Sequence, residues 1–129
     1  MIGIQITFRS GRFHGNGWHH AHNEGVPEWP PSPWRILRAL VSAAYALDVP
    51  PDEVQSLLEK LRELPRYRLP KAVDAHIRHY VPDTDDAKHK KAKIFDSFIA
   101  IDGGAVAPKP LEIAWDVELT ADERLLLKR

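Results

Sequence analysis

The segment Gly11–Val41 limits what this chain can fold into more than any other part of the sequence. It reads GRFHGNGWHHAHNEGVPEWPPSPWRILRALV and contains four histidines, three tryptophans and four prolines. Proline and glycine at this density interrupt helices and strands, so the segment predicts a long irregular loop that runs into a helix. Loops of this length are uncommon in compact domains and are often functional. We therefore expect the ring-bearing side chains of this loop to bind something.

Hydrophobic periodicity predicts the other elements. Ser32 is a good N-cap and Pro33 suits the first helical turn, which predicts a helix from Pro33 to about Ala46. A second apolar stripe predicts a helix from Pro51 that extends to about Leu64. The capping-box sequence Thr120–Glu123 opens a third helix. Period-two patterns predict strands over the ranges 2–9, 75–81, 93–101 and 111–119.

This order of elements favours an α+β fold with a mostly antiparallel sheet and helices on one face. A ferredoxin-like or RRM-like plan needs one more strand after the last helix. Here a clearly signalled helix stops after about two turns, at the last residue of the sequence. We therefore expect one domain over residues 1–129 that is incomplete at its C-terminus and forms the N-terminal part of a longer protein.

Composition excludes several classes of function. Hydrophobic residues make up 43% of the chain and charged residues 28%, as in soluble globular proteins. No apolar run approaches the ~20 residues of a membrane helix, and the N-terminus does not resemble a signal peptide. The absence of cysteine excludes disulfides and thiolate zinc sites and favours the cytoplasm. Phosphate-binding glycine loops and serine-nucleophile motifs are missing, so no cofactor is predicted.

The charges are unevenly distributed although they sum to zero. Residues 60–93 contain ten Lys or Arg against five Asp or Glu. Such a basic middle suggests a local face that binds anions, and the alternative is an ordinary solvated surface.

The histidines of the loop admit several interpretations. His20 and His22, with Glu24 and Glu28 nearby, have a spacing that metal ligands use, but no metal-binding framework such as HExxH accompanies them. Histidines also suit general acid–base cleavage of RNA without metal, which makes His14, His20 and His22 candidate catalytic residues. Imidazoles can instead contact bases and phosphates of bound RNA, or have no task at all.

Other side chains favour RNA binding. Trp18 is the best candidate for stacking on a base, whereas Trp29 and Trp34 are expected to fix the loop to a core. His76, Arg78 and Tyr80 share one face of the strand predicted over 75–81. An exposed strand face that mixes aromatic and basic groups in this way is typical of RNA-binding sheets. We expect this strand face and the histidine loop to form one common patch. The candidate RNA-binding residues are Arg9, Arg12, His14, Trp18, His19, His20, Arg35, Arg38, His76, Arg78, Tyr80, Lys88, Lys90, Lys91 and Lys93.

Four motifs also carry a family resemblance. GRFHG, NEGVPEWPPSPWRILRALV, HIRHYVP and KIFDSFIAI, in this order, resemble the N-terminal part of a CRISPR-associated fusion protein of type I-U, also called I-G. In that family a subunit that binds the 5′ handle of crRNA is joined to a repeat-processing endoribonuclease. The resemblance covers most of the chain, from about Ile2 to the last helix.

The resemblance implies an RRM-like module of antiviral defence that holds crRNA in a Cascade surveillance complex. Its partners would be crRNA, the Cascade backbone subunits and, through the complex, target DNA. The full fusion protein would also mature precursor crRNA without metal. The processing half is expected beyond Arg129, and the glycine-rich loop of such proteins is not present. For this chain we therefore expect RNA binding without catalysis, with a histidine-based endoribonuclease site as the alternative.

Overall fold

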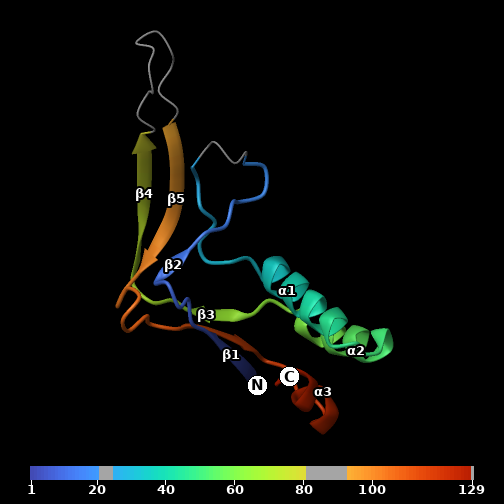
Figure 1. The fold of residues 1–129 in the computed structure, drawn as a ribbon. Coiled ribbons are helices and arrows are strands. Elements are labelled where there is room, and N and C mark those ends of the chain that lie inside the picture. Colours follow the sequence, from blue (N-terminus) through green and yellow to red (C-terminus); the bar gives the residue numbers. More distant parts are fainter. Residues whose placement is uncertain (21–24, 81–92, 129) are drawn as a thin grey trace. The chain divides into compact units, whose positions relative to one another are not determined.

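The computed structural model describes residues 1–20, 25–80 and 93–128, with only the course of the backbone for 79, 80 and 93–95. The described part is α+β, with two three-stranded antiparallel sheets and three helices (Figure 1). The chain divides into two compact units. The helical unit comprises Met1–Thr7, Pro30–Leu69 and Pro110–Arg129. The hairpin unit comprises Phe8–Trp29 and Pro70–Lys109. Because each unit combines separated segments, neither corresponds to one uninterrupted piece of chain.

The helices begin where their sequence signals predict. α1 spans Pro33–Ala46, and the side chain of Ser32 accepts a hydrogen bond from the backbone of Arg35 at 3.3 Å. α2 spans Pro51–Leu61 and α3 spans Ala121–Leu126. The predicted extension of α2 to Leu64 is wrong. Pro65 disfavours helical geometry at the residue before it, and the Leu64 side chain is 87% exposed.

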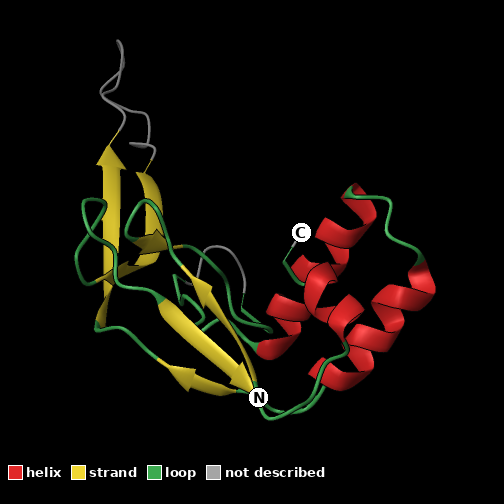
Figure 2. Cartoon of the chain, turned by 90° about the horizontal axis from the view of Figure 1, so that it is seen from below, coloured by secondary structure: helices red, strands yellow, loops and turns green. Residues whose placement is uncertain are grey.

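The sheet of the helical unit has the order β1-β6-β3, from β1 (Ile2–Ile6), β6 (Leu111–Trp115) and β3 (Arg66–Arg68). One face of β6 is fully buried and consists of Leu111, Ile113 and Trp115. The indole N–H of Trp115 donates to the carbonyl of Leu61 at 2.9 Å, which joins β6 to the end of α2. The three helices group together in this unit (Figure 2). None of the helices in the described residues combines the length and apolar character needed to span a bilayer.

The sheet of the hairpin unit has the order β2-β5-β4, from β2 (Arg12–Phe13), β5 (Lys93–Ile101) and β4 (Ala72–Tyr80). The two long strands β4 and β5 lie side by side over their whole length (Figure 1). The strand predicted over 93–101 is confirmed, and the one predicted over 75–81 begins earlier, at Ala72.

The prediction of one sheet is wrong, because the described strands form two. Three chain segments each supply one strand to each sheet: β1 and β2, β3 and β4, and β5 and β6. Each segment contains a strand breaker between its two strands. Gly11 precedes β2, Pro70 precedes β4, and a turn with Gly103 and Gly104 follows β5. These residues interrupt the ladders, since proline donates no backbone hydrogen bond and glycine adopts positive φ.

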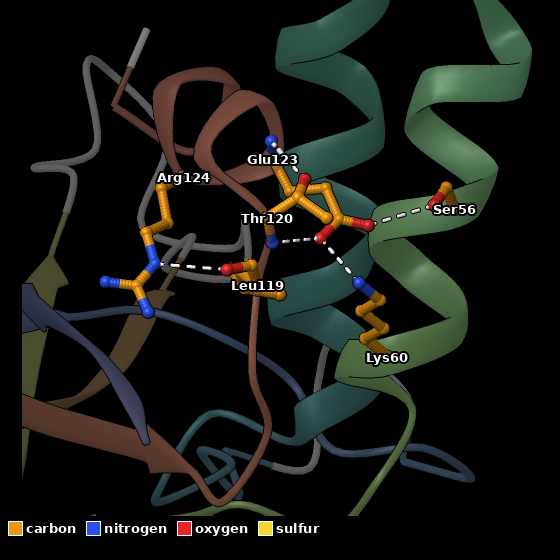
Figure 3. Close-up of polar contacts among 6 residues, drawn as sticks. All are labelled: Ser56, Lys60, Leu119, Thr120, Glu123 and Arg124. Atoms are coloured by element: carbon orange, nitrogen blue, oxygen red, sulfur yellow. Dashed lines mark hydrogen bonds and ion pairs between the residues drawn. The ribbon is translucent and has the colours of Figure 1, made fainter.

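A buried carboxylate joins α2 to α3 in the helical unit (Figure 3). Lys60 Nζ donates to Glu123 Oε2 at 2.6 Å, and Ser56 Oγ donates to Glu123 Oε1 at 2.9 Å. The predicted capping box is confirmed, because Thr120 N donates to Glu123 Oε2 and Glu123 N donates to Thr120 Oγ1. The Lys60 hydrogen bond, followed by that of the Thr120 backbone, lowers the pKa of Glu123 from 4.5 to about 2.

Removing this carboxylate should change the pH dependence of stability. Between pH 4.5 and about 2, the unfolded chain binds a proton at Glu123 that the folded chain does not, so the Glu123 contribution falls as pH falls. The free energies of unfolding of the wild type and of Glu123→Gln should therefore converge as pH decreases through this window. Urea titrations at several pH values measure this. Lys60→Met should weaken the same pH dependence, because the Lys60 hydrogen bond is the main cause of the lowered Glu123 pKa, whereas Lys128→Met, at an exposed lysine of the same unit, should leave it unchanged. Parallel curves for wild type and Glu123→Gln would contradict the account.

Candidate nucleic-acid interface

Strand β5 is the centre of the hairpin unit and determines which side chains share a face. Arg12 of β2 pairs with Ala100, and Phe13 pairs with Ile99. On the other edge, His76 of β4 pairs with Ser97. Residues directly opposite each other in antiparallel strands share a face, and successive residues alternate. The sheet therefore has one face that carries Phe98 and one that carries Ile99.

The Phe98 face carries a cation stacked on an aromatic ring. The guanidinium carbon of Arg12 lies 4.6 Å from the ring centroid of Phe98. The imidazole of His14 lies against the same ring, with 5.3 Å between centroids. Phe98 is only 5% exposed. Stacking holds the Arg12 side chain over the sheet while leaving the guanidinium edge available for hydrogen bonds.

A carboxylate orients the imidazole on this face. His14 Nδ1 lies 3.2 Å from Asp96 Oδ1, and both side chains are about half exposed, at 48% and 46%. Ion pairs this exposed contribute little to stability, roughly 0–1 kcal/mol. The contact therefore serves mainly to position the ring, which leaves Nε2 for a further partner.

The Ile99 face is apolar at one end and cationic at the other. Phe13 belongs to this face and packs with Phe8 and Trp29, at centroid distances between 5.2 and 6.0 Å. The prediction that Trp29 fixes the loop is confirmed by this cluster. Farther along β4, the exposed residues His76 and Arg78 lie on the same face as Ser97.

The expectation of one common patch is wrong for the part of the loop next to β2. Arg12 and His14 lie on the Phe98 face, whereas His76 and Arg78 lie on the opposite face. The sequence predicted the alternation within each strand but not the register between strands, and register decides which faces coincide. The hairpin unit therefore presents cationic side chains on both of its faces.

The other described RNA-binding candidates of the loop, Trp18, His19 and His20, lie in an exposed turn. His20 N donates to the carbonyl of Gly17 at 3.3 Å, and His19 has a φ of 69°. Positive φ is strained for residues other than glycine, and such strain is often found at functional sites. Trp18 is 59% exposed and is available for stacking. His19 and His20 are exposed beside it.

Other candidates lie elsewhere. Arg9 is exposed before β2. Arg35 and Arg38 are on α1 in the helical unit, where Arg35 is half-buried and Arg38 is exposed. The prediction that Trp34 fixes the loop to a core is wrong, since this side chain is 55% exposed at the start of α1. His22, Lys88, Lys90 and Lys91 are outside the described residues, as are the side chains of Tyr80 and Lys93.

Part of the basic middle of the sequence is neutralised in the helical unit. Arg66 lies 3.3 Å from Asp116, Arg68 lies 3.0 Å from Glu112, and Lys60 binds Glu123 as described above. All three carboxylates come from the acidic C-terminal part of the chain. The basic stretch is therefore a less continuous cationic face than its sequence suggests.

Two participants in the Phe98 face were not selected from the sequence. Phe98 and Asp96 lie within KIFDSFIAI, whose pattern predicts a strand and no site residue. An aspartate between apolar strand residues was the available signal, because a strand with one buried face rarely accepts a carboxylate without a partner.

Among the described residues, no group of three or more His, Cys, Asp or Glu is arranged to hold a metal ion. Comparisons of the chain with protein-family models, with curated proteins and with solved structures found no match. The functional argument therefore depends on the residues themselves.

The position of Arg12 depends on a glycine just before it. Gly11 has a φ of 66°, and a Cβ there would overlap the backbone of Gly104. Gly104 also has positive φ, at 54°, but a Cβ there would have open space. We predict that Gly11→Ala lowers the free energy of unfolding by more than about 2 kcal/mol, and Gly104→Ala by about 1 kcal/mol from φ strain alone. Urea titrations measure the difference, and equal effects would show that the close approach is absent.

Proposed function

We propose that this chain is an RNA-binding module with a ferredoxin-like, RRM-like plan that grips the 5′ handle of crRNA in a Cascade complex. The observation that carries the proposal is the set of arginine and histidine side chains on both faces of the β2-β5-β4 sheet, with Arg12 stacked on Phe98. The identity of the RNA rests on the motif resemblance to the type I-U CRISPR-associated fusion protein.

The topology of the strands supports the ferredoxin-like plan. The first segment supplies β1 and β2, the helices α1 and α2 follow, and the second and third segments precede α3. In both sheets the third segment lies between the first and the second. This order agrees with the split β-α-β arrangement of the proposed ferredoxin-like plan, in which the described strands would fill three of the four positions.

The character of the cationic side chains supports RNA rather than duplex DNA. Arg12, His76 and Arg78 are exposed on strands, and the exposed His14 directly follows β2, so none of them lies on a helix that could enter the major groove. Single-stranded RNA is bound by guanidinium groups that contact phosphates and by rings that stack on bases. A two-faced cationic hairpin can contact a strand that bends around it.

The alternative function is metal-independent cleavage of RNA by the histidines. The contact between His14 and Asp96 favours it, because a carboxylate that fixes one imidazole nitrogen leaves the other oriented as a general base. Such cleavage needs a second group to protonate the leaving oxygen. Of the other candidates, His20 is in the exposed turn, and His22 lies outside the described residues. The binding role requires no such second group and is therefore preferred.

The RNA-binding proposal predicts which arginines matter. Labelled repeat RNA is titrated with the full chain in EDTA at several salt concentrations. Arg12→Ala and Arg78→Ala should each weaken binding by about 1–2 kcal/mol, or roughly 5- to 30-fold in Kd. Each lost phosphate contact should also reduce the salt dependence, by about 0.7 in the slope of log K against log salt.

Arg66→Ala is the matched control. Arg66 is an exposed strand arginine of the helical unit and is paired with Asp116 of the same unit. Its affinity for RNA should equal that of the wild type. Equal losses for all three variants, or a flat salt response, would contradict the proposed interface. Cleavage in EDTA that is lost in His14→Ala would favour the enzyme, and cleavage that requires a divalent metal would contradict both functions.

A further inference from the structure

The helical unit contains an open apolar groove between α1 and α2, whose lining residues all belong to a different unit from the strands of the proposed RNA interface. Both views show the two helices side by side (Figures 1 and 2). The groove has a volume of about 1040 Å³. Its floor is aliphatic and consists of half-buried side chains from both helices: Leu37, Val41, Val54 and Leu58.

The groove exists because α1 has two apolar stripes. One stripe, with Ile36 and Ala44, is buried in the core of the unit. The other runs from Trp34 through Leu37 and Val41 to Tyr45 at helical spacing and lines the groove. Trp34 is 55% exposed and Tyr45 is 71% exposed. A helix with one core needs only one such stripe, so the second is available for an intermolecular contact.

The dimensions of the groove fit a helix better than a small molecule. Trp34 and Tyr45 mark its ends on α1, and the helix rises about 16 Å, or three turns, from one to the other. Sites for small molecules bury most of the ligand surface, which side chains this exposed cannot do. An amphipathic helix that places apolar residues at i, i+4 and i+7 is the usual occupant of such a groove.

The charges at the edge of the groove specify the partner further. Arg38 of α1 and Arg62, the C-cap residue of α2, line it and are exposed. In the described part of the chain, no ion pair involves either guanidinium. The acidic residue of the edge, Glu59, accepts a hydrogen bond from Gln55 at 2.9 Å. A neutral amide leaves the charge of Glu59 in place, so the lining carries two positive charges against one negative, with an arginine on each side of the apolar floor.

We propose that the α1–α2 groove docks an amphipathic helix of a partner protein, with acidic residues flanking its apolar stripe. The rings of Trp34 and Tyr45 lie only at the two ends of the groove, and the aliphatic floor between them argues against RNA as the occupant, because leucine and valine offer bases no ring to stack on. The proposal does not depend on the RNA-binding function, since all groove residues belong to the helical unit.

Two synthetic helical peptides test the proposal by fluorescence anisotropy with the full chain. Both have the same leucine stripe at i, i+4, i+7 and i+11. One has glutamates beside the stripe and the other has lysines at the same positions. The glutamate peptide should bind about tenfold more tightly, since two charge contacts each contribute a few tenths to one kcal/mol. The double variant Arg38→Glu/Arg62→Glu should reverse the preference.

Apolar variants test the floor and ends of the groove. Tyr45→Ala and Trp34→Ala should weaken glutamate-peptide binding about five- to tenfold, whereas Leu64→Ala, at an exposed leucine outside the groove, should not. Circular dichroism checks that the variants are folded. Each of three results would overturn the proposal: equal binding of both peptides, self-association of the chain that Tyr45→Ala abolishes, or loss of RNA affinity rather than peptide affinity in these variants.

Discussion

The pairing of β5 with β2 and β4 is the interaction on which the candidate interface depends. It fixes Arg12 opposite Ala100 and His76 opposite Ser97, and these two pairs have opposite parity on β5. A slip of one residue in either ladder would transfer a whole set of cations to the other face. β2 contributes only two residues to this register. The turn at Gly11, whose carbonyl accepts from Ile101 N at 2.8 Å, therefore has to hold the short strand in place.

The two units have different surface chemistry. In the hairpin unit, arginine and histidine extend from a sheet whose aromatic residues stabilise them, as Phe98 does for Arg12. In the helical unit, the sheet arginines Arg66 and Arg68 are paired with carboxylates, and the open surface is the apolar groove between α1 and α2. A module that holds RNA within an assembly needs both kinds of surface. We propose the first for RNA and the second for a protein helix.

Local signals predicted most elements of the fold. The Ser32 cap, the Thr120–Glu123 capping box and the alternation in KIFDSFIAI each act within a few residues, so the sequence displays them directly. The separation into two sheets depends on pairings between distant residues, such as Ile2 with Trp115, which no local pattern encodes.

The same limit explains why the sequence predicts only part of the candidate site. Arg12 and His14 were selected by residue type, but their partners Phe98 and Asp96 are more than 80 positions away along the chain. Trp34 was assigned to a core because aromatic residues near prolines usually pack, and the second apolar stripe of α1 was not recognised.

A disulfide between β2 and β5 tests the face assignment most directly, because the natural chain has no cysteine. Gly11 and Ile101 form a hydrogen-bonded position, so Arg12 and Ala100 form the adjacent non-hydrogen-bonded pair, with Cα atoms about 4.5 Å apart. That distance permits a disulfide. Arg12→Cys/Ala100→Cys should therefore oxidise to an intramolecular disulfide in air, as shown by mass spectrometry, while Arg12→Cys/Ile99→Cys should remain reduced. The opposite result would mean that the register is shifted by one residue and that Arg12 lies on the Ile99 face.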